Sequence, residues 1–442
     1  MGWLRRAIGR PPAADDAASS RRTVGPGERA AAAEEFSVRA GHAALPEVTG
    51  PADGVLTGAV IALVCFGVVM VYSSSAVLAY SRHDDGQHFL VRQSIYALLG
   101  LFGMVVLARF DYHRLHVLSR PILVATVLLL GATAFGLGKS AGGASRWIEL
   151  GPIHIQPAEV AKIAMICWLS YSLSKKTRER IRSFKFGFLA PMPAALLVIW
   201  LCMKQPDFGS AVMVGLLTFV LLFTAGARLS YILGASALAL PIIHHVVMGS
   251  EYRVRRIVAY LSPFQYRYDE GYQIAESLMS FGSGGVTGIG IGDSRQKLFF
   301  LPEAHTDFIS AIVGEELGFI GFALMVLTYL VVLQRGFRAA FRAVDDYGTY
   351  LAVGVTMFIG LQAFTNLAVA LGLLPTKGLV LPFVSFGGSA LLVNCAAVGI
   401  LLNVSRPRAG AYSHQHEEPE ATPLGATPVN VRARVAQRGG IA

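Results

Sequence analysis

Long apolar stretches recur along almost the whole chain, and short polar segments separate them. A helix needs about 20 mostly apolar residues to cross the hydrocarbon core of a bilayer. Ten stretches approach or exceed this length, at residues 55–80, 89–109, 118–137, 157–174, 187–203, 207–226, 229–248, 307–334, 349–372 and 384–404. The pattern predicts an all-α integral membrane protein with about ten transmembrane helices.

The composition excludes a water-soluble enzyme. Hydrophobic residues make up 54% of the 442 residues, charged residues make up 15%, and the mean hydropathy is +0.53. Soluble domains carry about 25% charged residues. The four cysteines, Cys65, Cys167, Cys202 and Cys395, lie inside apolar stretches without a CxxC spacing. They therefore predict neither a disulfide framework nor a metal site.

Basic residues between the apolar stretches predict the orientation in the membrane. They follow the second, fourth, sixth and eighth stretches, at Arg109, Arg114, Arg120, Lys175, Lys176, Arg178, Arg180, Arg182, Lys185, Arg228, Arg335, Arg338 and Arg342. Cytoplasmic loops carry such an excess of Lys and Arg. We therefore expect these loops and both termini in the cytoplasm, and we interpret the net charge of +10 as topological rather than as a sign of nucleic-acid binding.

The chain divides into a membrane domain and two tails. Residues 1–52 contain seven arginines, show no apolar periodicity and lack the apolar core of a signal peptide. We expect a disordered basic cytoplasmic tail there, a ten-helix membrane domain over 53–405, and a second disordered cytoplasmic tail over 406–442. No nucleic-acid-binding segment is expected in either tail.

Two outward loops, 138–156 and 249–306, are too long and too glycine-rich to serve only as connectors. The second lies between the seventh and eighth predicted helices, and long loops in compact proteins are usually functional. Its cluster Arg253, Arg255 and Arg256 stands on the side where the orientation rule disfavours positive charge. The cluster indicates an anionic partner at the outer membrane surface, and a solvated loop with balanced charges is the alternative.

Asp307 stands where this loop ends and the eighth predicted helix begins. A carboxylate there can simply cap the helix or interact with its dipole. Its neighbours Glu303 and His305 favour a second interpretation, because they form a polar cluster beside the membrane surface. A carboxylate that faces cations at this surface is a plausible general base.

Other charges lie at membrane depth, where an unpaired charge is costly. Glu159 and Lys162 are three residues apart near the start of the fourth predicted helix and are expected to pair with each other. Glu315 and Glu316 point in different directions on the eighth, so we expect at least one to pair with a buried Lys or Arg. Between the ninth and tenth helices, a segment rich in Pro and Gly carries Lys377 and Ser385 and is expected to line a cavity.

Taken together, these clusters resemble the FtsW/RodA/SpoVE family, the SEDS proteins of cell-wall synthesis. The resemblance runs in order over residues 55–405, through the stretches Gly143–Pro152, Gln156–Lys162, Gln205–Ala211, Gln296–Lys297, Leu301–Phe308, Gly314–Gly318 and Leu374–Ser389. Ala304 stands where members of the elongation branch usually carry Arg, so the chain is more similar to the division branch. Ala158, Glu276 and Phe386 depart from the residues most common in the family.

The resemblance implies a peptidoglycan glycosyltransferase that polymerises lipid II into glycan strands during septal cell-wall synthesis. Asp307 corresponds to the family's essential loop aspartate, which is proposed to deprotonate the acceptor's sugar hydroxyl. The candidate substrate-binding residues are Arg146, Glu159, Lys162, Arg253, Arg255, Arg256, Lys297, His305, Lys377 and Ser385. Two other functions stay open: a lipid II flippase and a non-catalytic scaffold for a transpeptidase.

The resemblance also implies partners and a location. The expected partners are lipid II, a class B penicillin-binding transpeptidase of the FtsI type, other division proteins and the membrane. The expected location is the cytoplasmic membrane at the division septum. The sequence predicts no metal cage and no tightly bound cofactor, but a divalent cation, Mg²⁺ or Mn²⁺, can assist by binding to the pyrophosphate oxygens.

Overall fold

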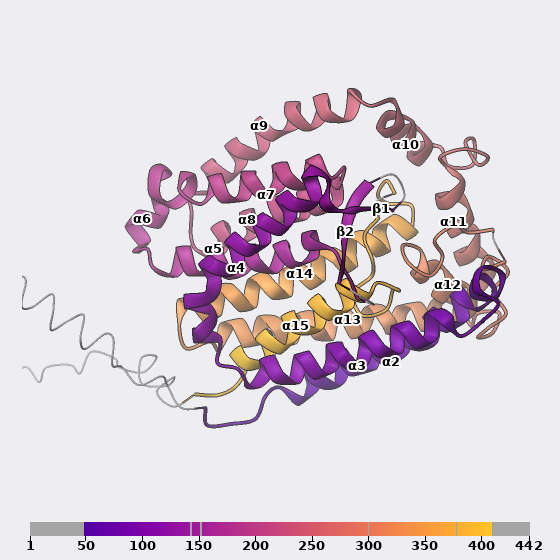
Figure 1. Cartoon of the computed structure of the whole chain (residues 1–442), viewed down its shortest axis with the longest axis horizontal. Coiled ribbons are helices and arrows are strands. Elements are labelled where there is room, and N and C mark those ends of the chain that lie inside the picture. Colours follow the sequence, from indigo (N-terminus) through magenta and orange to yellow (C-terminus); the bar gives the residue numbers. More distant parts are fainter. Residues whose placement is uncertain (1–47, 142–143, 151–152, 299, 377, 409–442) are drawn as a thin grey trace, which may run out of the picture. The chain divides into compact units, whose positions relative to one another are not determined.

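The computed structural model describes residues 48–141, 144–150, 153–298, 300–376 and 378–408 (Figure 1). Helices dominate this part of the chain. The first half contains α2 (Gly54–His83), α3 (His88–Arg109), α4 (Tyr112–Ala132), the π-helical turn η1 (Thr133–Leu137), α5 (Pro157–Ser174), α6 (Arg178–Arg182), the π-helical turn η2 (Phe184–Leu189), α7 (Met192–Lys204) and α8 (Phe208–Thr224). The second half contains α9 (Leu229–Met248), α10 (Glu251–Leu261), α11 (Tyr272–Gly284), α12 (Ile309–Glu316), α13 (Gly318–Phe341), α14 (Asp346–Ala370) and α15 (Gly388–Val404).

Each of the ten predicted membrane stretches contains at least one helix. Seven helical segments in the described part of the chain are long and apolar enough to cross a membrane. The three remaining stretches correspond to α5, α8 and α15, which have 18, 17 and 17 residues. A helical membrane protein is therefore confirmed, while the count of ten spans stays a prediction.

The structure adds detail where the sequence predicted loops. Residues 138–156 contain a small antiparallel sheet with the order β1 (Lys139–Ala141), β2 (Ala144–Leu150) and β3 (Ile153–Ile155). Residues 249–306 contain α10 and α11 rather than a purely irregular loop. The all-α prediction thus holds for the membrane-embedded part but misses this three-stranded sheet.

The eighth predicted helix is broken in two at Gly318. This residue has φ +65°, a backbone conformation that favours glycine, and it separates α12 from α13. A Cβ built on Gly318 would lie 2.3 Å from the backbone nitrogen of Gly288. The close approach of the loop backbone therefore explains both the break and the glycine.

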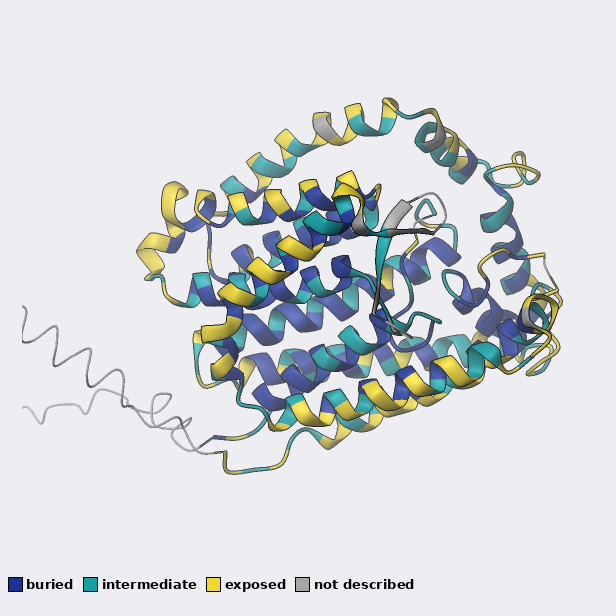
Figure 2. Cartoon of the chain, in the orientation of Figure 1, coloured by how far each residue is buried: buried dark blue, intermediate teal, exposed yellow. Residues whose placement is uncertain are grey.

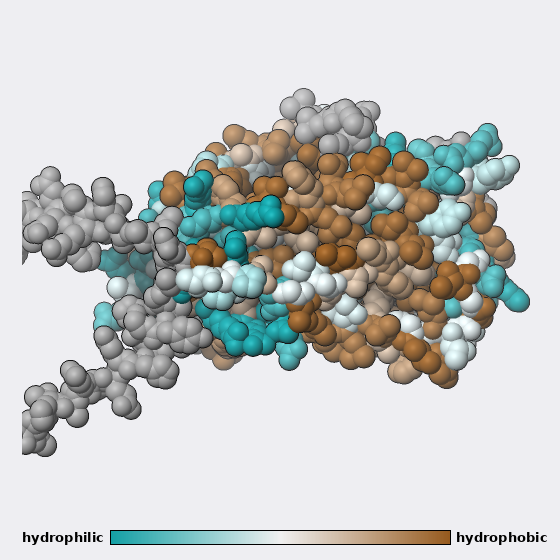
Figure 3. All heavy atoms as spheres, turned by 90° about the horizontal axis from the view of Figure 1, so that it is seen from below, coloured by the Kyte–Doolittle hydropathy of each residue, from teal (hydrophilic) through white to brown (hydrophobic). Residues whose placement is uncertain are grey.

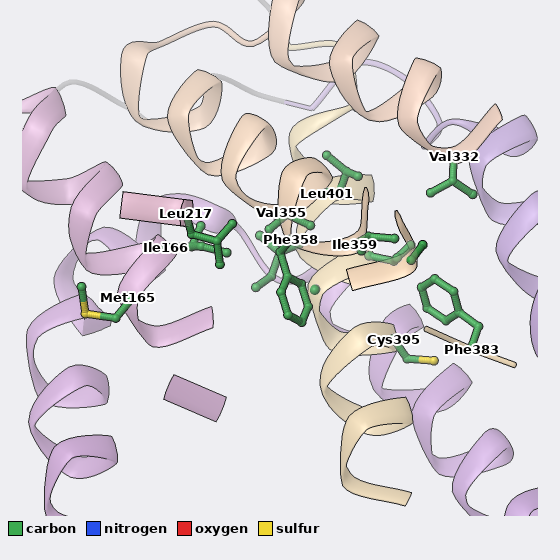
Figure 4. Packing of buried hydrophobic residues seen from close by; sticks show 14 of the residues in the cluster. Met165, Ile166, Leu217, Val332, Val355, Phe358, Ile359, Phe383, Cys395 and Leu401 are labelled. Atoms are coloured by element: carbon green, nitrogen blue, oxygen red, sulfur yellow. The ribbon is translucent and has the colours of Figure 1, made fainter. Parts of the chain in front are cut away.

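The core forms around α14. This helix packs against α5, α8, α13 and α15, and Phe358 in its middle is fully buried. Figure 4 shows Phe358 and Val355 near Ile166 and Leu217, with Ile359 on the side of Phe383. Figure 2 shows that the buried residues gather in these central helices, whereas α9 carries mostly exposed and half-buried positions.

The outer surface of the helices is apolar, as expected for contact with lipid. Leu98, Phe102 and Leu128 are each about two-thirds exposed or more, at 70%, 69% and 68%. Figure 3 shows hydrophobic residues across the middle of one face, with hydrophilic residues gathered nearer its two ends. This distribution fits a helical bundle whose two polar ends face water on opposite sides of a bilayer.

We call the two ends of the bundle the tail end and the loop end. At the tail end, the segment before α2 pairs with the segment after α15, because Thr49 N donates to Pro407 O at 2.9 Å. Arg408, which is 4% exposed, donates there to Asp111 at 3.2 Å and to Asn403 at 2.9 Å. The loop end carries the sheet, α10, α11 and α12 (Figure 1).

We predict that Gly67→Ala destabilises the bundle. A Cβ at Gly67 in α2 would lie 2.4 Å from the carbonyl oxygen of Phe383 and 2.7 Å from Val384 Cα, so the backbone at Phe383 and Val384 would have to move. We expect a loss of about 1–3 kcal/mol, seen as a lower thermal midpoint in detergent. The matched control is Gly58→Ala in the same helix, where a Cβ meets nothing within 4 Å. Equal midpoints for the two variants would contradict the tight contact.

Candidate active site

A cavity of about 640 Å³ opens at the loop end of the bundle. Segments far apart in the sequence build it: β2, the start of α8, the end of α9 with α10, the turn before α12, and the segment after α14. Its charged lining residues are Arg146, Asp207, Arg253, Arg256, Glu303 and Asp307. Carboxylates and guanidinium groups therefore share one concave site.

A tight turn and one buried amide hold Asp307 in place. The backbone nitrogens of Thr306 and Asp307 donate to the carbonyl oxygen of Glu303, at 3.2 and 3.1 Å. Asn366 of α14, which is 2% exposed, donates from Nδ2 to Asp307 O at 2.8 Å and to Leu379 O at 2.7 Å. Asn366 thus ties the Asp307 backbone to the segment after α14, which also lines the cavity.

The Asp307 carboxylate does not cap α12. The residue at the cap position is Phe308, and no side-chain capping bond is made there. Among the described residues, none donates a hydrogen bond to this carboxylate, and a Cβ on Gly378 would lie 3.5 Å from its Oδ2. The simple capping interpretation therefore lacks the bond on which it depends.

The surroundings of Asp307 favour its protonated form. Burial, and to a smaller extent the nearby Glu303 charge, raise its pKa from the ordinary value of 3.8 to about 7, against the opposing effect of Arg256. A carboxyl group whose pKa lies near neutral pH is suited to accept a proton during catalysis. Perturbed values of this kind are common at functional sites.

The arginine cluster on α10 divides between two faces of that helix. Arg253 and Arg256 line the cavity, and Arg256 Nη1 donates to Thr376 O at 3.4 Å. Arg253 Nη1 donates to Val246 O at 2.7 Å. Arg255 instead forms an ion pair with Glu270 at 3.1 Å and is 56% exposed. The helical spacing thus selects two of the three arginines for the cavity.

Arg146 joins the cavity from β2. Its Nε donates to Gln205 O at 2.9 Å, and a second nitrogen donates to Pro206 O. Gln205 is itself fixed by hydrogen bonds to Leu130 O at 2.9 Å and to Thr133 Oγ1 at 2.8 Å. These contacts orient the guanidinium group at the start of α8.

Glu159 and Lys162 form the predicted ion pair, with 2.6 Å between Lys162 Nζ and Glu159 Oε1. Both are buried in α5, and Lys162 Nζ also lies 5.4 Å from the ring centre of Phe358. Pro157 occupies the first turn of that helix, where the missing backbone N–H of proline costs no hydrogen bond. Neither charged residue lines the cavity, so their contact with substrate stays a prediction.

Lys297 also lies apart from the cavity lining. Its Nζ is 3.4 Å from Glu316 Oε1 and bonds to Gly292 O, and Ser73 of α2 donates to the same carboxylate at 2.7 Å. The expectation that one of the two adjacent glutamates pairs with a cation is therefore confirmed. Glu315 accepts a hydrogen bond from Ser294.

Three more predicted site residues differ in their surroundings. His305 is buried beside two aromatic rings, with ring centres 5.0 Å from Phe89 and 5.7 Å from Phe386, and burial lowers its pKa. Ser385 Oγ accepts a hydrogen bond from Leu381 N at 2.9 Å and so closes a turn. Lys377 lies outside the described residues, although its neighbours Thr376 and Gly378 line the cavity.

Sequence reasoning missed several polar residues at the cavity. Asp207 caps α8 through Ser210 N at 3.0 Å, and Gln156 Nε2 donates to it at 3.2 Å. Its position in the stretch Gln205–Ala211 was the only available signal. Ser250 and Gln273 also line the cavity but stand in no motif that could have indicated them.

Comparison with known proteins decides the family. A family model described as "Cell cycle protein", for FtsW, RodA and SpoVE, matches residues 55–410. The chain is 49% identical over 346 residues to the probable peptidoglycan glycosyltransferase FtsW of Geobacter metallireducens, which covers 78% of this chain and 92% of that protein. It is 41% identical over 346 residues to the stage V sporulation protein E of Bacillus subtilis, with 78% and 94% covered. This chain belongs to the FtsW/RodA/SpoVE family.

Solved structures of the family share the fold. A chain of a peptidoglycan synthase complex that coordinates polymerization and crosslinking matches with a TM-score of 0.68 and 29% identity, over 80% of this chain and 97% of that chain. The rod shape determining protein RodA of Thermus thermophilus matches with a TM-score of 0.60 and 29% identity, over 81% and 98%.

The three departures from the common FtsW/RodA/SpoVE residues each have a structural setting here. Ala158 is fully buried in the first turn of α5. Glu276, which is 2% exposed, accepts hydrogen bonds from Arg267 at 3.0 and 3.1 Å. Phe386 packs edge-on against Phe89 with 5.1 Å between ring centres. None of the three lies among the residues that line the cavity.

Proposed function

We propose that this chain polymerises lipid II, with Asp307 as the general base and the cavity as the site of glycosyl transfer. The observation that best supports this proposal is that Asp307 lines the same cavity as Arg146, Arg253 and Arg256. The family supports the reaction class, because several relatives are named peptidoglycan glycosyltransferases. The septal role follows the division branch of the family.

The proposed chemistry is a single displacement at a sugar carbon. The Asp307 carboxylate accepts the proton of the acceptor's sugar hydroxyl, and the resulting oxygen attacks the anomeric carbon of the donor. The bond from that carbon to the lipid-linked pyrophosphate breaks, and the pyrophosphate leaves with the bonding electron pair. Arg253 and Arg256 offset the negative charge that develops on the leaving group.

A divalent cation fits this proposal as a companion of the substrate. No group of three or more His, Cys, Asp or Glu side chains in the described part of the chain is arranged to hold a metal. Mg²⁺ or Mn²⁺ would bind pyrophosphate oxygens, and Asp207, Glu303 and Asp307 are the carboxylates that line the cavity beside them. The cation would stabilise charge on the leaving group.

Orientation, location and partner complete the proposal. The basic loops at the tail end face the cytoplasm, so the cavity opens on the outer side of the membrane. We expect both termini in the cytoplasm, and the protein at the septum beside a class B transpeptidase of the FtsI type. The structural similarity to a peptidoglycan synthase complex supports a transpeptidase partner.

The test is polymer formation by the purified full-length chain with its transpeptidase and labelled lipid II. Glycan strands resolved on a gel support the proposal. A flippase would move labelled lipid II across vesicle membranes without making polymer, and a scaffold would do neither. Polymer formed only by an added partner polymerase, with none from this chain, would reject the proposed function.

The pH dependence follows from the raised pKa of Asp307. A general base must be ionised, so kcat/KM is expected to fall as the pH drops through about 7, approaching tenfold per pH unit. The Glu303 charge raises this pKa, so Glu303→Gln should lower it and move the acid limb to lower pH. The control is Glu251→Gln, an exposed carboxylate on α10 outside the cavity. An acid limb that stays in place in Glu303→Gln would contradict the coupling.

A further inference from the structure

A second concave site lies at the tail end of the bundle, far from the active-site cavity. It is an open groove of about 870 Å³ between the start of α2 and the end of α13. Its lining residues are Val55, Val331, Gln334, Arg335, Phe337, Arg338, Phe341 and Arg342. Because α13 has 24 residues at about 1.5 Å each, the groove lies roughly one membrane thickness from the break at Gly318.

Helical periodicity places three arginines of α13 on one face. Arg335, Arg338 and Arg342 follow one another at spacings of three and four residues, which is one side of a helix. Arg335 is 3.5 Å from Asp53 and is partly neutralised. Arg338 and Arg342 are exposed, and no side-chain ion pair joins either to another described residue.

Apolar side chains complete the groove beside these cations. Phe341 is 81% exposed and Val55 is 48% exposed, and both border the arginines. The dipole of α13 accounts for a cation in its last turn. It does not account for a groove in which exposed apolar groups and guanidinium groups alternate along one helix face at the edge of a membrane span.

We propose that this groove binds the headgroup of an anionic phospholipid from the cytoplasmic leaflet. The phosphate contacts Arg338 and Arg342, and the acyl chains follow the apolar surface of α13 toward the bilayer. Basic pockets between transmembrane helices on the cytoplasmic side are suited to anionic lipid headgroups. The inference depends on the proposed orientation but not on the glycosyl transfer reaction, so it goes beyond the proposed function.

The experiment measures lipid retention by the full-length protein. Wild-type chain in detergent is titrated with phosphatidylglycerol or phosphatidylcholine, and bound lipid is counted by native mass spectrometry. We expect phosphatidylglycerol to bind preferentially and Arg338→Gln/Arg342→Gln to weaken its binding by about tenfold or more, because each basic residue near an anionic lipid surface contributes about a factor of five. Arg338→Lys/Arg342→Lys should keep most of the binding.

The matched control is Arg180→Gln/Arg182→Gln, which removes two exposed cations from α6 at the same end of the bundle. It should bind phosphatidylglycerol like the wild type, and thermal midpoints without lipid should show that all variants fold. Inorganic phosphate at millimolar concentration should not displace phosphatidylglycerol, because it cannot make the contacts of the acyl chains with the apolar surface of α13. Equal loss in both Gln pairs, or no preference for phosphatidylglycerol in the wild type, would overturn the proposal and indicate another occupant of the groove.

Discussion

Asp307→Asn is expected to abolish lipid II polymerisation while leaving the fold intact. The change removes the negative charge and the basic lone pair, and general-base catalysis typically contributes 10²–10⁴-fold. The backbone bonds that hold this turn, from Asn366 and to Glu303, do not use the carboxylate. The measurement is initial rate of glycan formation from labelled lipid II, with thermal stability recorded in parallel.

The matched control for this variant is Asp293→Asn, a carboxylate of the same long loop that is exposed and does not line the cavity. We expect it to polymerise lipid II at the wild-type rate. Wild-type rates in a well-folded Asp307→Asn protein would reject Asp307 as the general base. Burial raises the pKa of Asp307, which means that the ionised carboxylate costs folding free energy. Asp307→Asn removes this cost, so the thermal midpoint of the variant should not fall.

The second large effect is expected from the two arginines of α10 that face the cavity. Arg253→Gln/Arg256→Gln should lower kcat/KM for lipid II by about 10²-fold, because a hydrogen bond to a charged group contributes about 1.5–3 kcal/mol. Arg255→Gln is the matched control on the same helix, because its guanidinium pairs with Glu270 away from the cavity. We expect it to stay within a factor of about two or three of the wild type.

The single variants Arg253→Gln, Arg255→Gln and Arg256→Gln test whether binding depends on which arginines line the cavity or only on the total positive charge of α10. If a general basic patch attracted the substrate, Arg255→Gln would cost as much as Arg253→Gln, and rising salt would reduce the difference between them. If the cavity binds the pyrophosphate, only the two cavity arginines should matter. Comparable losses in all three single variants would contradict the placement of the site.

The apolar pattern predicted the helices well because every membrane span must satisfy its backbone hydrogen bonds internally. The pairing of Glu159 with Lys162 was equally predictable, since both lie one turn apart on one helix. The break at Gly318 was not predictable from local pattern, because it depends on a loop backbone that is distant in the sequence.

The sequence predicted which types of side chain lie at the candidate site, but not which individual residues line it. Asp307 stood in a recognisable stretch, and three arginines line the same cavity. Arg253, Arg255 and Arg256 are neighbours in the sequence and were predicted to act together. On α10, however, Arg255 lies away from the cavity and forms an ion pair with Glu270. Lys297, His305 and Ser385 belong to the stretches that carry the family resemblance, but their contacts are with Glu316, aromatic rings and a turn.

The buried charges also differ in when they can be neutralised during synthesis. Glu159 and Lys162 belong to one helix, so their ion pair can form as soon as α5 is helical, before any other helix is present. Glu316 depends on Ser73 from α2 and Lys297 from the long loop, and its own helix has only eight residues. An unpaired carboxylate is costly inside a bilayer. Insertion of α5 can therefore be autonomous, whereas α12 reaches its final depth only after α2 and the loop have provided its partners.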